Sequence, residues 1–261
     1  MTRRRWIASE FDDGFATLKG EQANHLIRVL RAETGMRADV VAGKSVFAAV
    51  IENVGETVVR FRLEREIERD EPLPLRLWLA VFKFDRMEWA VEKATELGVS
   101  AIVPVISRRT EKHLAQAATT RVERWRRIAL EAAKQSRGSG VPEIATPITL
   151  SAALKQSTTQ DGRRILLWEQ ESEHTLARCV TDAEGPMAEG GVTLAVGPEG
   201  GWTEDEVALF SSCGWISATL GARILRAETA VIAGIAIISA RLQETGQQER
   251  DEFSNESSAS K

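Results

Sequence analysis

The stretch TLAVGPEGGWTEDE, residues 193–206, is the most informative about the fold of this chain. The apolar run at 192–196 predicts a buried strand, and a glycine-rich loop at 197–202 comes next. Thr203, with Glu206 three residues later, is the capping-box pattern that begins a helix. Open α/β sheets bind ligands at the carboxyl ends of their strands, so this loop is a candidate ligand site.

The chemistry of the loop does not suit a phosphate. It has neither the Lys nor the Ser/Thr of a P-loop, it does not match the dinucleotide pattern G-x-G-x-x-G, and Pro198 removes a backbone donor. Glu199 would repel a diphosphate and would favour a ligand with hydroxyls, an ammonium or a sulfonium. S-adenosylmethionine has all three. The loop by itself is equally consistent with a tight turn that needs glycine dihedral angles.

A second loop of the same kind lies in ATLGARILRAETAVIAGIAIISARL, residues 218–242. A strand to Leu220 is followed by Gly221, by two arginines, and by a helix that is apolar nearly all round at 230–240, which predicts enclosure by protein. A Rossmann enzyme has its glycine loop after the first strand. Here the first strand of the larger domain is followed by KFDRMEW, residues 83–89, which has no glycine.

The rest of the sequence divides the chain into three parts. Residues 1–70 contain short β-branched runs at 39–43, 46–54 and 57–66, as in a small barrel, and one helix around ANHLIRVLR. Residues 73–244 alternate apolar strands at 75–82, 101–107, 164–168, 192–196 and 217–220 with helices, one of them opened by Thr120 and Glu123 and running to about Ser136, which predicts a parallel α/β sheet. Residues 245–261 are polar and are expected to form a disordered tail.

Composition excludes several classes of protein. Two cysteines and three histidines without paired spacing predict neither a disulfide framework nor a metal site. The longest uncharged apolar segment, 229–240, has 12 residues, against roughly 20 for a membrane span, so we expect a cytoplasmic protein without membrane segments. The net charge is −4, yet residues 108–137 carry nine Lys/Arg against three acids, which indicates a local surface for a polyanion.

Four motifs, LAVGPEGGWTEDE, LGARILRAETA, MEWAVEKATELGVSAIVPV and IALEAAKQS…VPEI, together resemble the bacterial 16S rRNA (uracil-N3)-methyltransferases of the SPOUT, or α/β-knot, superfamily. HLIRVLR also resembles the PUA-like RNA-binding domain of that family, so the resemblance covers nearly the whole chain. KQSRGSG, residues 134–140, departs from the family pattern, and the role of that stretch stays open.

The resemblance implies a C-terminal trefoil-knotted α/β domain with a mostly parallel sheet, a small N-terminal PUA-like β-barrel domain, and a homodimer formed through the knot domain. It implies S-adenosylmethionine as cofactor and N3 of a uridine in 16S rRNA of the small ribosomal subunit as target. The cofactor would lie among loops at 167–169, 197–201 and 220–225. The predicted cofactor-binding residues are Leu167, Trp168, Glu169, Val196, Gly197, Pro198, Glu199, Gly200, Gly201, Leu220, Gly221, Ile224, Leu225 and Arg226. A β-branched residue in place of Gly200 is expected to abolish binding.

Methylation of uracil N3 requires loss of an imide proton and stabilisation of negative charge on the flanking carbonyls. Arg226 is the candidate for that charge or for an RNA phosphate, and the alternative is a structural clamp. Glu228 or Glu199 is the candidate proton acceptor, although an acid at the position of Glu228 also stabilises a helix N-terminus. The predicted RNA-binding residues are Arg3, Arg4, Arg5, Asn24, Arg28, Arg31, Arg108, Arg109, Arg124 and Arg127. A solvated helix face is the alternative for part of this set.

Two other functions compete with the methyltransferase hypothesis. A non-catalytic RNA-binding or ribosome-assembly protein could keep a degenerate knot domain, but both glycine loops and Arg226 are present. A nucleotide-dependent oxidoreductase is disfavoured because no phosphate-binding loop is found.

Overall fold

The computed structural model describes residues 5–43, 45–67, 72–136, 140–157, 162–181 and 191–259, with side chains as far as residue 244. Arg3 and Arg4 of the predicted RNA-binding set lie outside these residues. The chain divides into two compact units, Met1–Glu71 with Ala133–Gly140, and Pro72–Ala132 with Val141–Lys261. Among the described residues, no helix combines the length and the apolar character needed to cross a bilayer.

The first unit is a curled six-stranded sheet in the order β1-β4-β5-β6-β3-β2. Its strands are β1 (Arg5–Ile7), β2 (Glu10–Asp12), β3 (Phe15–Leu18), β4 (Arg37–Ala42), β5 (Ser45–Val54) and β6 (Val59–Ile67). All neighbours are antiparallel except β1 and β4, and the pairing of β5 with β6 shifts register twice. Such bulges bend a strand and let a small sheet curl around its core, here Leu18, Val40, Ile51 and Phe61.

The helix predicted around ANHLIRVLR begins and ends earlier than expected and is less regular. It consists of α1 (Gly20–Asn24) and a π-helical turn, η1 (His25–Val29), in which the Leu30 amide bonds to the His25 carbonyl at 3.1 Å. Arg31 has φ of 49°, and the Ala32 amide bonds back to Leu26, so the chain leaves the helix there. In consequence the apolar side chain of Val29 is 64% exposed.

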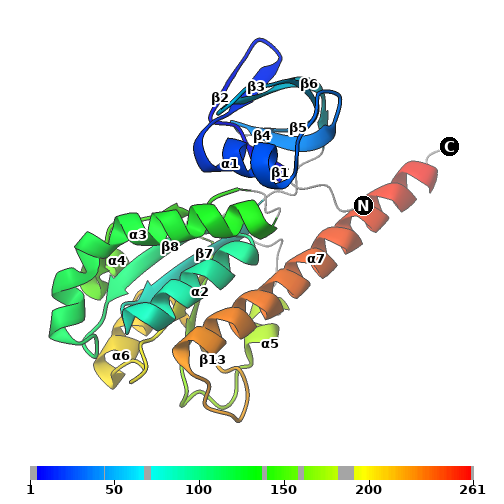
Figure 1. Cartoon of the computed structure of the whole chain (residues 1–261). Coiled ribbons are helices and arrows are strands. Elements are labelled where there is room, and N and C mark those ends of the chain that lie inside the picture. Colours follow the sequence, from blue (N-terminus) through cyan, green and yellow to red (C-terminus); the bar gives the residue numbers. More distant parts are fainter. Residues whose placement is uncertain are drawn as a thin grey trace. The chain divides into compact units, whose positions relative to one another are not determined.

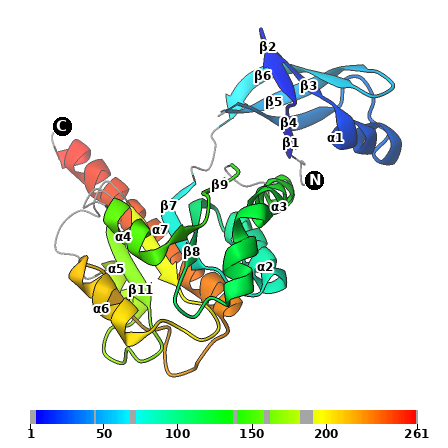
Figure 2. The same cartoon turned by 90° about the vertical axis from the view of Figure 1, so that its left-hand side faces the viewer.

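The second unit is an α/β/α sandwich, shown in Figure 1 and, turned by 90°, in Figure 2. Its described strands form a parallel sheet in the order β10-β8-β7-β12-β11-β13, with β9 beside β8. In chain order the elements are β7 (Leu73–Ala80), α2 (Phe84–Glu96), β8 (Val99–Ile106), α3 (Lys112–Ser136), β9 (Glu143–Ile144), β10 (Ile148–Thr149), α4 (Leu150–Gln156), β11 (Arg163–Leu167), α5 (Leu176–Thr181), β12 (Val192–Val196), α6 (Glu204–Ser212), β13 (Ile216–Ala218) and α7 (Ala227–Ala259).

The central strands are buried on both faces, as the continuous apolar runs predict. Leu75, Leu77 and Leu79 of β7 pack on one face against α2, α3, α5 and α7. Trp78, with Phe210 of α6, lies in the core on the other face, which α4 and α6 cover. Successive side chains of a strand alternate between its faces, so one strand serves both cores. Figure 1 shows α2 and α7 side by side on the first face, where they are in contact.

Two elements extend beyond the boundaries expected from the sequence. Helix α3 begins at Lys112 and not at Thr120, whose hydroxyl bonds to the Ala117 carbonyl inside the helix. The buried stripe of Leu114, Ala118 and Val122 extends upstream of Thr120 and explains the earlier start. Helix α7 continues to Ala259, through the segment expected to be a disordered tail, in which no proline interrupts the helix and Gln, Glu and Arg favour it.

Candidate functional site

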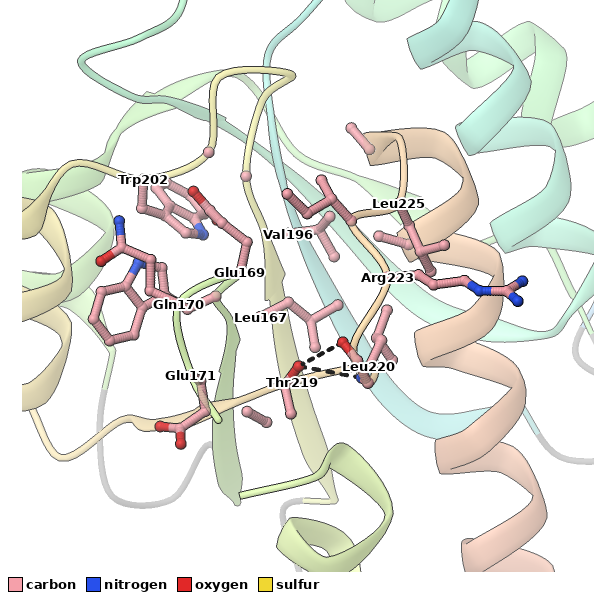
Figure 3. Close-up of a pocket in the computed structure, with 18 of the residues that line it drawn as sticks. Leu167, Glu169, Gln170, Glu171, Val196, Trp202, Thr219, Leu220, Arg223 and Leu225 are labelled. Carbon is pink, nitrogen blue, oxygen red and sulfur yellow. Dashed lines mark hydrogen bonds between the residues drawn. The ribbon is translucent and has the colours of Figure 1, made fainter. Parts of the chain in front are cut away.

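A pocket of about 580 Å³ lies where the chain leaves β11, β12 and β13 at the carboxyl edge of the sheet (Figure 3). The three strands are neighbours, because β11 lies between β12 and β13, so their following turns meet. Leu167 and Val196 close the pocket toward the core, and the side chain of Leu225 faces them in Figure 3. Turns from three strands therefore line one pocket, and they include the two glycine loops singled out in the sequence.

The turn after β12 is held by the Gly201 amide, which donates to the Pro198 carbonyl at 2.8 Å. Gly201 has φ of 70°, a region in which glycine is favoured, and a Cβ there would collide with the carboxylate of Glu169. Under the turn, Trp202 is buried, and a Cβ on Gly197 would lie 3.2 Å from its indole nitrogen. The capping box predicted after the turn is confirmed, since Thr203 and Glu206 bond reciprocally at the start of α6.

The turn after β13 is fixed by Thr219. Its amide donates to the His174 carbonyl at 2.8 Å, and its hydroxyl exchanges hydrogen bonds with the backbone of Gly221, the dashed lines of Figure 3. Gly221 has φ of 110°, and a Cβ there would meet no atom within 4 Å. Beyond it the loop is open to solvent, with Ile224 86% exposed.

The turn after β11 is ordered by Glu171, a residue that the sequence reasoning missed. Its carboxylate accepts the Ser217 hydroxyl at 2.5 Å and the amides of Glu173 and His174 at 2.8 and 3.1 Å. The Ser217 hydrogen bond, followed by those amides, lowers the pKa of Glu171 to about 2, against the effect of burial. Because the donors at 173 and 174 are backbone amides, their side chains give no sequence signal for this loop.

The pocket brings together every predicted cofactor-binding residue except Arg226. Among lining residues that the prediction did not include are Gln170, Glu171, Thr219 and Arg223. Figure 3 shows the guanidinium of Arg223 directed away from the pocket centre, whereas the side chains of Glu169 and Trp202 lie on the opposite wall.

The three predicted catalytic residues occupy different positions. Arg226 is exposed at the start of α7, next to the lining residues Leu225 and Ala227, and its side chain forms no hydrogen bond or ion pair with the described residues. Glu199 lines the pocket, with Oε1 3.8 Å from Nη1 of Arg86. Glu228 is 8% exposed and does not line the pocket, and its Oε1 lies 3.9 Å from Nε of the same arginine.

A second cavity, of about 260 Å³, lies on the other side of the turn after β12 and shares Glu199 and Gly200 with the pocket. Lys83, Arg86 and Arg109 supply positive charge to its wall. Arg86 was not predicted, because nothing in KFDRMEW indicates that its side chain meets residues more than a hundred positions later.

Several predicted RNA-binding residues make contacts within their own unit. Arg124 pairs with Glu88 through two hydrogen bonds of 2.5 and 2.7 Å, and the Arg108 guanidinium pairs with Asp205 at 3.0 Å. Arg109 donates to the Gly200 carbonyl, which attaches it to the pocket turn. Arg127 is exposed, as are Arg28 and Arg31 in the first unit, where Asn24 is half-buried and Arg5 lies in β1.

Known proteins are similar to this chain in sequence and in fold. The RNA methyltransferase domain family matches residues 69–239. The ribosomal RNA small subunit methyltransferase E of Synechocystis sp. is 33% identical over 246 residues, which are 93% of this chain and 79% of that protein. The protein of the same name from Bacillus subtilis is 29% identical, over 85% of this chain and 89% of its own length.

Two solved structures add three-dimensional similarity. The ribosomal RNA small subunit methyltransferase E of Neisseria gonorrhoeae, bound to S-adenosyl methionine, has a TM-score of 0.77 at 28% identity and covers 92% of this chain and 98% of its own. A methyltransferase of Legionella pneumophila in complex with the bound cofactor SAM has a TM-score of 0.71 at 28% identity, with the same coverages. With its three-turn pocket and these similarities, the chain belongs to the RNA methyltransferase domain family and, within it, to the ribosomal RNA small subunit methyltransferase E family.

Proposed function

We propose that this chain transfers the methyl group of S-adenosylmethionine to N3 of a uridine in 16S rRNA of the small ribosomal subunit. Family membership supports methyl transfer to ribosomal RNA, and two similar structures hold S-adenosylmethionine. The observation that carries the proposal is the pocket at the ends of β11, β12 and β13. The base and the atom come from the resemblance of the motifs.

The pocket residues fit this cofactor. Glu169, Glu171 and Glu199 line the pocket, and Arg223, the basic residue among its lining, turns away from the centre. Such a wall favours an ammonium, a sulfonium and hydroxyls and disfavours a diphosphate. Because Gly201 has no Cβ, the carboxylate of Glu169 can lie directly against the turn and add negative charge to the wall. Bound there, S-adenosylmethionine supplies a methyl group on a sulfonium cation.

The residues of the chain have to bind the uridine, remove its N3 proton and stabilise the resulting charge. Arg226 is exposed beside the pocket and lacks an ion-pair partner among the described residues, so its guanidinium can face the uracil carbonyls. Glu199 lines the pocket and can accept the proton, whereas Glu228 is buried behind Arg86. We therefore assign the proton to Glu199 and the charge to Arg226.

RNA binding is assigned to both units. Residues 1–70 would form the PUA-like domain, with Arg5, Asn24, Arg28 and Arg31 and with Arg3 and Arg4 before them. In the domain at 73–244, Arg127 and Arg109 remain accessible, while the internal ion pairs of Arg108 and Arg124 make these two weaker candidates. Contacts with phosphates make affinity depend on salt, which is the measurable signature of this assignment.

A homodimer through the knot domain is the assembly we propose, in the cytoplasm. Helix α7 follows β13 and packs back against β12, α2 and α5, and this return is where the trefoil knot would be tied. Small residues such as Ala236 and Ala240 are exposed along α7, and Trp89 of the adjacent α2 is 42% exposed. A second copy could cover this face.

The test is methylation of 16S rRNA by the purified full-length chain with isotopically labelled S-adenosylmethionine, followed by mass spectrometry of the nucleosides. The proposal expects label in N3-methyluridine. Cofactor binding without transfer to any RNA would favour the alternative, a non-catalytic RNA-binding protein. Binding of NADH in place of S-adenosylmethionine would support an oxidoreductase instead.

A further inference from the structure

Arg86 of α2 lies between the two segments that border the pocket. Its Nη1 is 3.8 Å from Oε1 of Glu199, in the turn after β12, and its Nε is 3.9 Å from Oε1 of Glu228, in the first turn of α7. Glu199 lines the pocket, and Glu228 directly follows the lining residue Ala227. One side chain from a third element therefore interacts with both segments.

The burial of Glu228 makes its interaction with Arg86 important for stability. The side chain of Glu228 is 11% exposed, and its Oε2 has no hydrogen-bond partner among the described residues. Within the same part of the chain, no other basic side chain forms an ion pair with Glu228 or Glu199. A buried carboxylate that loses its counter-charge is strongly destabilising, although the N-terminus of α7 offsets part of that cost.

The position of Arg86 separates its role from direct catalysis. It lines the second cavity, on the far side of the turn, and does not line the pocket. Both ion-pair distances exceed hydrogen-bond length, so the attraction is between charges and depends weakly on the shape of the cation. If Arg86 is removed, the carboxylates of Glu199 and Glu228 become two like charges with no cation between them. The turn at 198–201 would then tend to separate from α7.

We propose that Arg86 is a positioning residue, which fixes the turn at 198–201 relative to the first turn of α7 by facing Glu199 and Glu228 at once. The same contact holds the start of α7, where Arg226 emerges, and so keeps the two assigned reactive groups beside one pocket. The effect on turnover rests on the function proposed above. The effect on cofactor affinity does not depend on which RNA atom is methylated.

The experiment compares Arg86→Gln, Arg86→Lys, and the double variant Arg86→Gln/Glu228→Gln with the parent chain. Lys93→Gln is the matched control, because Lys93 lies on the same helix, is 28% exposed, and pairs with Glu92 and Glu96 at 2.8 and 2.7 Å away from the pocket. Thermal unfolding without cofactor, calorimetry with S-adenosylmethionine, and kcat and KM for 16S rRNA are measured for each chain.

Arg86→Gln is expected to raise the Kd for S-adenosylmethionine and to lower kcat, each by about ten-fold, with the KM for RNA unchanged. Arg86→Lys restores part of the cofactor affinity and part of kcat, and Lys93→Gln changes neither quantity. The double variant regains thermal stability, because the buried carboxylate is neutral, but it does not regain affinity or kcat.

Parental Kd and kcat in Arg86→Gln would overturn the proposal. So would a double variant that recovers affinity and kcat together with stability, since Arg86 would then be merely structural. A parent chain that binds the cofactor but methylates no uridine, with weaker binding in Arg86→Gln, would refute the proposed function and leave the role of Arg86 standing.

Discussion

Substitution of Gly201 by Ala adds a single methyl group to the wall of the pocket and tests whether the turn at 198–201 binds the cofactor. Gly201 has φ of 70°, which an L-residue adopts at a cost of roughly 1–2 kcal/mol, and the added Cβ would also collide with the carboxylate of Glu169. The strain alone corresponds to a change of about five- to thirty-fold in an equilibrium constant. Relief of the strain requires movement of the turn or of Glu169, and both line the pocket.

Two neighbouring glycines provide the controls. Gly221→Ala adds backbone strain without a collision, because φ is 110° and no atom lies within 4 Å. Gly200→Ala meets only the flexible side chain of Arg109, at 3.1 Å from Cδ, and adds no strain of this kind. Calorimetry with S-adenosylmethionine should therefore rank the losses of affinity as Gly201→Ala, then Gly221→Ala, then Gly200→Ala. Equal affinities for Gly201→Ala and the parent chain, both folded, would refute the reasoning.

Three further predictions follow from the site. Because the pKa of Glu171 is lowered from 4.5 to about 2, its ionised carboxylate contributes stability that is complete above pH 4.5 and is lost as the pH falls toward 2. Glu171→Gln should flatten this part of the pH dependence of the unfolding free energy, and an unchanged profile would contradict this prediction. Arg226→Gln should lower kcat by roughly 10²-fold with little change in Kd for S-adenosylmethionine, because the side chain does not line the pocket; a parental kcat would reassign the charge. Arg28→Gln or Arg31→Gln should each reduce the slope of log affinity against log salt by about 0.7, and an unchanged slope would remove that residue from the RNA surface.

The sequence predicted the elements that local chemistry specifies. Val192–Val196 is the strand expected, and the Thr203–Glu206 capping box forms, because both patterns involve neighbours in the chain. The predicted turns meet because the strands that precede them are adjacent in the sheet. The expectation that Gly200 is critical for cofactor binding stays a prediction, whereas the contact of Gly201 with Glu169 was not predicted because it joins distant segments.

The remaining features depend on contacts between distant segments. Arg124 was predicted on an RNA surface from local charge, and in the structure its guanidinium donates two hydrogen bonds to the carboxylate of Glu88 on another helix. Arg86 lies in a segment with no motif and meets Glu199 and Glu228 only after the sheet has formed. The π-helical turn at His25–Val29 was not predicted, because the spacing of apolar residues does not distinguish a single π-helical turn from an α-helix.

The central claim is that the turns after β11, β12 and β13 together hold the methyl donor, and a crystal structure with S-adenosylmethionine tests it most directly. The account predicts the adenosyl group among these turns, close to the backbone at Gly201, with the sulfonium near the acidic wall of Glu169 and Glu199. A ligand bound anywhere else, or one that leaves these three turns empty, would contradict the account.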